Sequence, residues 1–139
     1  MTVHRFRYPK GARLKKAWQF DYLFRTGRRI RGELVRLLFI TSPDGTTQLG
    51  VAVGKRQGNS PKRSRGRRIL KESFRRLLPW VKDGYWVVCT PRTEALGISA
   101  RKVYQDISSL MFRAGLLNED WPGPDWDIDG RLSADENAG

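Results

Sequence analysis

The sequence has few of the residues that build enzyme active sites. Its 139 residues include one histidine, His4, and one cysteine, Cys89. With so few ligands and bases, neither a zinc cluster nor a Ser/His triad can be assembled. Cys89 ends the apolar run Tyr-Trp-Val-Val-Cys, which predicts a buried, unreactive thiol. Acids before Asn118 are scattered singly, so we expect no catalytic residue and no metal ligand in the protein itself.

Long apolar runs are also missing. No segment approaches the roughly 20 consecutive apolar residues of a membrane-spanning helix. The N-terminus carries Arg5, Arg7 and Lys10 without the apolar segment of a secretory signal. We therefore expect a cytoplasmic protein that has no membrane partner.

Acidic residues are scarce except at the C-terminal end. The chain has 27 Lys and Arg against 14 Asp and Glu, a net charge of +13. From Asn118 onward seven acids accompany one arginine, so residues 1–117 are more basic than the whole. Such an excess predicts a polyanionic partner. Residues 118–139, with Pro122, Pro124 and few aliphatic residues, are expected to be a disordered acidic tail.

Hydrophobic patterning predicts a single α/β domain over residues 13–117, after a basic, irregular N-terminus at residues 1–12. Its excess of Lys and Arg makes it the expected RNA-binding domain. Helices are expected over residues 14–25, 60–78 and 99–115, and strands over residues 33–41, 46–54 and 85–90. A basic stretch at residues 28–32 leads into the first expected strand. This order, α-β-β-α-β-α, indicates an α+β fold. Ser42-Pro43-Asp44-Gly45 favours a turn, so we expect the first two strands to form an antiparallel hairpin. Ser60 is the expected N-cap of the second helix, with Pro61 in its first turn.

The expected central helix has two different faces. Apolar residues gather on one side, with Gly66 beside them. This set is Ile69, Leu70, Phe74, Leu77 and Leu78. A polar and basic ridge runs along another side at steps of three and four residues. It consists of Ser64, Arg67, Arg68, Lys71 and Arg75.

The charge of this helix is poorly compensated within the sequence. Glu72 is the only acid among the bases between Lys62 and Arg76. Lys62, Arg63 and Arg65 also lie at the positive end of the helix dipole, where each cation destabilises the helix by ~0.3–1 kcal/mol. A solvated basic face is the ordinary alternative, but this arrangement favours an anionic ligand.

The loop before that helix, residues 54–60, has features of a phosphate contact. Gly54 and Gly58 let the backbone approach a ligand, and the amides at a helix N-terminus favour phosphate. The spacing differs from that of a Walker loop. We therefore count Lys55, Arg56 and Asn59 among the expected RNA-binding residues.

The first helix carries two apolar stripes. Leu14, Trp18 and Tyr22 form one stripe, whereas Ala17, Phe20 and Phe24 form the other. We expect one set to pack in the core and the other to line a groove, where exposed aromatic rings beside cations would suit the stacked bases of single-stranded RNA. The alternative is a helix buried on both sides.

Taken in order, these segments resemble the bacterial ribonuclease P protein family from about Arg13 to Leu117. The similarity rests on Arg13-Leu14-Lys15-Lys16 with Phe20, Phe24 and Gly27, on Gly58-Asn59, on residues 63–75 around Arg63-Ser64-Arg65, and on residues 85–92. Ser64 stands where the family usually has Asn. The order of the pieces is more specific than any one of them.

The resemblance implies an α/β sandwich with a left-handed crossover, an arrangement also found in ribosomal-protein domains. It also implies a ribonucleoprotein in which the catalytic RNA, holding most of the magnesium, removes the 5′ leader of precursor tRNA. Phe20, Phe24, Ser64, Arg68 and Lys71 would bind the leader, which leaves Leu14 and Trp18 for the core. Arg63, Arg65 and Arg67 would face the catalytic RNA.

Two other classes of nucleic-acid-binding protein are alternatives to this family. A structural RNA-binding protein of the ribosomal type would need a similar basic α/β surface. A DNA-binding regulator is disfavoured because the elements enclose a sheet and no helix-turn-helix stands out. We expect no DNA partner.

Overall fold

The computed structural model describes residues 10–55, 58–92 and 97–124. Its elements are α1 (Ala17–Thr26), β1 (Arg28–Arg31), β2 (Val35–Thr41), β3 (Gln48–Val51), α2 (Ser60–Leu77), β4 (Tyr85–Pro91) and α3 (Ala100–Arg113), with short 3-10 turns at Lys10–Ala12 and Leu78–Trp80. The expectations for residues 1–9, Arg56 and residues 125–139 lie outside these ranges.

The four strands form one mixed sheet in the order β1-β2-β4-β3. β1 and β2 are antiparallel, β2 and β4 are antiparallel, and β3 runs parallel to β4. The predicted hairpin between residues 33–41 and 46–54 is therefore wrong, because β4 lies between β2 and β3. The true hairpin joins β2 to β1, a strand that we had interpreted only as a basic stretch.

The turn after β2 passes around the beginning of β4. The Ser42 N–H donates to the Gly84 carbonyl at 2.8 Å, and the Gly84 N–H donates to Thr47 Oγ1 at 2.8 Å. Ser42-Pro43-Asp44-Gly45 does turn the chain, with Gly45 at φ 77°. After this turn the chain leaves the position beside β2 to β4 and enters the sheet as β3, on the far side of β4.

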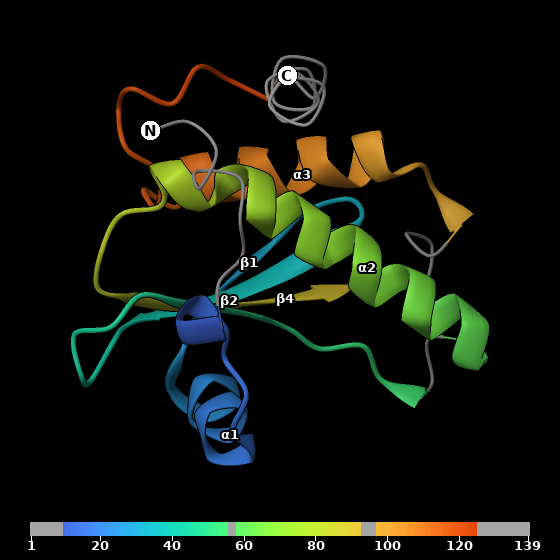
Figure 1. Cartoon of the computed structure of the whole chain (residues 1–139), viewed down its shortest axis with the longest axis horizontal. Helices are drawn as coiled ribbons and strands as arrows, with labels where there is room; N and C mark the ends of the chain where they lie inside the picture. Colours follow the sequence, from blue (N-terminus) through green and yellow to red (C-terminus); the bar gives the residue numbers. More distant parts are fainter. Residues whose placement is uncertain (1–9, 56–57, 93–96, 125–139) are drawn as a thin grey trace.

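Helices cover both faces of the sheet, as the α+β sandwich requires (Figure 1). α1 lies on one face, while α2 and α3 lie side by side on the other. The core beneath α2 and α3 includes Leu37, Phe39, Leu70, Phe74 and Ile107. A smaller core beneath α1 contains Leu14, Leu23, Leu38, Trp86 and Val88. α2 joins the parallel neighbours β3 and β4; the left-handed sense of this crossover stays a prediction.

The helix boundaries follow capping chemistry. Asn59, not Ser60, caps α2: its Oδ1 accepts the Lys62 N–H at 3.1 Å, and Pro61 lies in the first turn. An Asn side chain satisfies this amide as well as Ser would, which moves the cap by one residue. The predicted cap of α3 is confirmed, since Ser99 accepts the Lys102 N–H at 3.4 Å. Gly115 ends that helix with φ 76°.

α1 packs through a narrow line between its two aromatic stripes. It begins at Ala17, later than predicted, and its buried residues are Gln19 and Leu23. At 100° per residue these two positions lie between the stripes, so the aromatic rings lie on both flanks. Leu14 is buried as predicted, but Trp18 is 56% exposed, so its assignment to the core is wrong.

Gln19 can be buried because both its oxygen and its nitrogen are hydrogen-bonded. Its Oε1 accepts the backbone N–H groups of Lys15 and Lys16, and its Nε2 donates to Gln48 Oε1 at 2.9 Å. A polar residue thus takes a core position that a search for apolar stripes passes over.

Candidate RNA interface

Phe20 and the N-terminal segment form a groove with β3 and α2. The groove has a volume of about 310 Å³. Its walls are Arg13, Leu14, Lys15, Phe20, Gly50, Val51, Arg67 and Lys71. Gly50 lets the Leu14 and Phe20 side chains lie against the β3 backbone, because a Cβ at position 50 would lie 2.8 Å from Leu14 Cβ and 3.0 Å from Phe20 Cζ. The groove therefore combines a half-buried aromatic ring with cationic side chains.

A basic hollow adjoins this groove along α2. It has a volume of about 360 Å³ and is lined by Arg13, Arg68, Lys71, Glu72 and Arg75. Arg13 and Lys71 line both spaces, so the groove and the basic hollow are continuous. Arg67, Arg68, Lys71 and Arg75 of the predicted ridge thus line these two adjoining spaces, whereas Ser64 lines neither.

Glu72 pairs with the last arginines of α2. Its carboxylate accepts from Arg75 at 2.6 Å and from Arg76 at 2.9 Å. Partial burial raises the pKa of Glu72, but the hydrogen bonds and charges of Arg75 and Arg76 outweigh it and lower the pKa below 4.5. The single acid therefore compensates the C-terminal part of the ridge and leaves Arg68 and Lys71 exposed.

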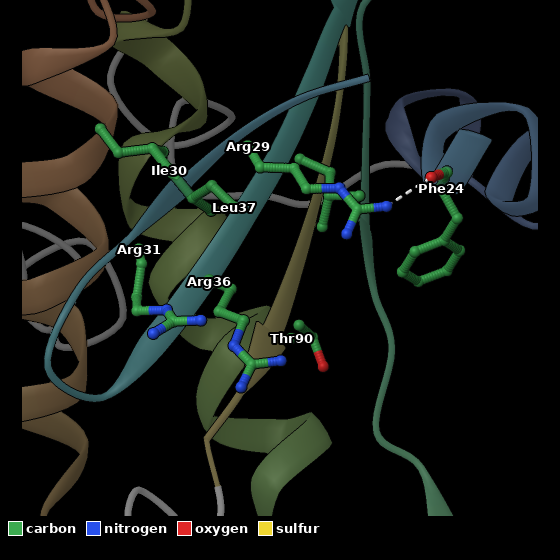
Figure 2. Close-up of a pocket in the computed structure, with 8 residues that line it drawn as sticks. Phe24, Arg29, Ile30, Arg31, Arg36, Leu37 and Thr90 are labelled. Atoms are coloured by element: carbon green, nitrogen blue, oxygen red, sulfur yellow. Dashed lines mark hydrogen bonds between the residues drawn. The ribbon is translucent and has the colours of Figure 1, made fainter. Parts of the chain in front are cut away.

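A second hollow lies at the other end of α1 (Figure 2). It has a volume of about 220 Å³ and is lined by Phe24, Arg29, Ile30, Arg31, Arg36, Leu37, Leu38 and Thr90. Arg29 Nη2 donates to the Phe24 carbonyl at 2.6 Å, which ties β1 to the end of α1. Phe20 and Phe24 are one turn apart, so their rings lie on the same face of α1, one in each hollow.

The loop and the first turn of α2 hold the remaining predicted residues. Lys55 and Arg65 are exposed, and Asn59 is used as the cap. Arg63 Nη2 donates to Ser60 Oγ at 3.1 Å, and Arg67 Nη2 donates to Ser64 Oγ at 3.4 Å. These internal contacts orient the guanidinium groups along the helix surface.

Sequence reasoning missed the arginines of the β1–β2 hairpin and the role of Gly50. The signal for the first was the stretch of residues 28–32, read as a connection because no alternating apolar pattern marks it as a strand. No local pattern distinguishes Gly50, because its role depends on a side chain 30 residues earlier.

The described residues include no group of three or more His, Cys, Asp or Glu side chains arranged to hold a metal ion. Burial, followed by the negative charge of Asp106, raises the pKa of the Cys89 thiol well above its ordinary value. In the same part of the chain, no helix is long and apolar enough to cross a membrane.

Comparison with known sequences decides the family. The Ribonuclease P family model matches residues 8–115. The ribonuclease P protein component of Symbiobacterium thermophilum is 32% identical over 112 residues, which cover 80% of this chain and 97% of that protein. The chain belongs to the ribonuclease P protein family. The ribonuclease P protein component of Chlamydia trachomatis is 39% identical over 91 residues, which cover 65% of this chain and 75% of that protein.

Solved structures of ribonuclease P proteins share the fold. The Staphylococcus aureus protein superposes with a TM-score of 0.70 at 18% identity, covering 78% of this chain and all of that one. The Thermotoga maritima protein gives a TM-score of 0.65 at 24% identity, and the superposition covers 73% of this chain and 96% of that one. The mixed sheet between α1 and the α2–α3 pair is thus the fold of this family.

Proposed function

We propose that this chain is the protein subunit of a ribonuclease P holoenzyme, and that it binds both the catalytic RNA and the 5′ leader of precursor tRNA. The observation that carries the proposal is the groove in which Phe20 lies over Gly50 and beside Arg67 and Lys71. Single-stranded RNA needs surfaces of this kind, since aromatic rings stack on bases and cations neutralise the backbone.

The groove and the neighbouring helix surface have different tasks in this proposal. Phe20, Phe24, Ser64, Arg68 and Lys71 contact the leader. A further set of polar and basic residues contacts the catalytic RNA. That set is Lys55, Arg56, Asn59, Arg63, Arg65, Arg67 and Arg75.

The chemistry of cleavage belongs to the RNA in this proposal. Magnesium, bound mainly by the catalytic RNA, would supply the activated nucleophile and stabilise the charge of the scissile phosphate. The protein residues bind and orient the leader and lower the repulsion between two polyanions. We place the holoenzyme in the cytoplasm, with neither DNA nor a membrane as partner.

Reconstitution tests the proposal. The purified protein alone should not cleave precursor tRNA, whereas the protein with its cognate catalytic RNA should cleave it at a lower magnesium concentration than the RNA alone. Specific 5′ cleavage by rigorously RNA-free protein would contradict the division of labour. Binding to RNA with no effect on the cleavage reaction would favour the structural RNA-binding alternative.

A further inference from the structure

The basic hollow beside α2 holds more positive charge than the described residues neutralise. Among these residues Glu72 is the only acid in its lining, and the Glu72 carboxylate already pairs with Arg75 and Arg76. Arg68 and Lys71 are exposed, and neither takes part in a hydrogen bond or ion pair with the described residues. Two cations of one helix therefore face the hollow without a counter-charge from the described chain.

One acidic segment of the chain lies outside the described residues. Residues 125–139 contain five acids and one arginine, and so carry a net charge of −4. The other stretches outside the described ranges contain Glu94 as their single acid. Asp125, Asp127 and Asp129 stand at every second position, and alternate residues of an extended chain lie on one side of it, about 6.6 Å apart. An extended segment of this sequence would present a row of carboxylates, much as single-stranded RNA presents a row of phosphates.

The chain approaches this acidic segment beside the C-terminal end of α2 (Figure 1). The Asn118 N–H donates to the Trp80 carbonyl at 2.7 Å, and Leu117 forms a β-bridge with Val81, a few residues after the end of α2. The basic hollow extends to the same end of the helix, because Arg75 in the last turn lines it. The 18 residues of α2 span about 27 Å, whereas the chain after position 124 spans about 50 Å when extended. The acidic segment is therefore long enough to reach every cation of the hollow.

We infer that residues 125–139 occupy the basic hollow of their own chain when RNA is absent, with carboxylates beside Arg68 and Lys71. A weak contact suffices, because the tether keeps the segment at an effective concentration of the order of millimolar. A long RNA displaces the segment, since it contacts more cations and releases more counterions. A short or poorly fitting RNA competes less well, so the segment makes the surface more selective. This competition rests on the proposed function, whereas the occupancy of the hollow does not.

Carbodiimide coupling tests the occupancy on the full-length, RNA-free protein at low salt. The reagent condenses a carboxylate with a lysine amine only where the two are in contact. The expected product is a link within one chain, from an acid of residues 125–139 to Lys71, identified by peptide mass spectrometry. Lys102 is the control, because it is exposed on α3 and does not line the hollow. The link to Lys71 should disappear at high salt and when the catalytic RNA is added.

A short single-stranded RNA oligonucleotide tests the competition. Asp125→Asn combined with Asp127→Asn should raise the affinity of the full-length protein for this RNA roughly threefold to tenfold, the combined strength of two exposed ion pairs. Glu119→Gln combined with Asp120→Asn is the matched control. It removes two acids just before the segment, both of which are exposed and outside the lining of the hollow. The control should raise the affinity much less.

The gain from the two aspartate changes should depend on the cations of the hollow. In a protein that carries Arg68→Gln and Lys71→Gln, the same aspartate changes should have little effect on affinity, because the segment has lost its site. A protein with Lys102→Gln and Arg113→Gln loses two cations of α3 that lie outside the hollow's lining, and it should keep the full gain. This comparison separates a docked segment from a general effect of net charge.

Each contrary outcome overturns a stated part of the inference. Links that reach Lys71 and Lys102 equally, or that join two chains, overturn the occupancy within one chain. Equal gains from the aspartate pair and from the control pair overturn the competition, as does a full gain in the protein that lacks Arg68 and Lys71. A protein that shows the Lys71 link but does not assist cleavage by the catalytic RNA would contradict the proposed function alone, since the link is measured without RNA.

Discussion

The Asp106 carboxylate occupies the space that a side chain at Gly32 would need. Asp106 Oδ2 accepts the backbone N–H groups of Leu34 and Val35 at 2.9 and 3.0 Å. A residue of α3 thus holds the turn between β1 and β2, and it holds the hairpin that carries Arg31 and Arg36. Glycine is required at position 32 because of this close approach, not because of its backbone angles.

Replacing either partner should destabilise the protein. Asp106→Asn removes a charged acceptor from two amides and should lower the free energy of unfolding by about 1–3 kcal/mol. Gly32→Ala should do the same by displacing the carboxylate. Urea unfolding measures both effects. Asp21→Asn is the control: its ion pair with Arg25 at 3.6 Å is exposed, and its removal should change little.

Trp18 and Trp86 should differ in their contribution to stability. Their rings meet edge to face with centroids 5.5 Å apart, but Trp86 is fully buried and its Nε1 donates to Thr46 Oγ1. Trp86→Ala should cost about 3–5 kcal/mol. Trp18→Ala should cost clearly less, because much of that ring is already in water. Equal losses in urea unfolding would mean that Trp18 is buried in solution.

Phe20→Ala should separate leader recognition from general attraction. The change should cost ~1–3 kcal/mol of stacking toward precursor tRNA in the holoenzyme and leave leaderless tRNA nearly unaffected. Arg68→Ala should also weaken precursor binding, but its defect should shrink as salt rises, since it removes a charge contact. Parallel salt titrations of the two variants check this contrast. Equal weakening of both substrates by Phe20→Ala would remove Phe20 from the leader groove.

Acid should weaken the C-terminal end of α2 through Glu72. Its pKa is lowered in the folded protein, so its contribution to stability is present above its unfolded pKa near 4.5 and is lost as the pH falls through the folded value. The side chain is one-third exposed, so the effect should be at most about 1 kcal/mol. Glu72→Gln should flatten this part of the pH–stability curve. Identical curves for both proteins would contradict the linkage.

Salt and the acidic residues after Pro124 should both weaken binding to RNA. If ~6–10 phosphates are contacted, affinity should fall ~10³–10⁵-fold between about 50 and 200 mM salt. Truncation after Pro124 removes five acids and one arginine and should strengthen non-specific binding. The cut spares Asn118 and Trp121, since Asn118 donates to the Trp80 carbonyl and Trp121 contacts Phe112. Filter binding over a salt series measures both; unchanged affinity would make the removed residues bystanders.

Local signals in the sequence predicted the parts of this fold that depend on local chemistry. The apolar face of α2 is confirmed at Leu70, Phe74 and Leu77, because helical periodicity directly reports the buried side. The end of α3 at Gly115 was predictable because glycine readily adopts the positive φ that ends a helix, and the burial of Cys89 because it closes an apolar strand segment.

The error in the sheet concerns pairing over a long distance. A strand pattern at residues 46–54 states which side chains face the core but not which strand is its neighbour. β4 competes for the same position beside β2 and lies some 40 residues further along, so no local pattern reveals the competition. For the site, cationic residues on α2 were predictable from spacing. The hollow at Phe24 was not, because it requires the register between Arg31 and Arg36.

The position of β4 between β2 and β3 also sets the order in which the protein can become competent during synthesis. The hydrogen bond from Gly84 to Thr47 spans 37 residues, and β3 has no strand to join until β4 has been made. A nascent chain that ends before Tyr85 contains the residues of β1 and β2, but β3 has no neighbouring strand to fix Gly50 against Phe20. Non-local pairing of this kind forms slowly, so the groove between Phe20 and Gly50 is completed only after α2 and β4 have emerged.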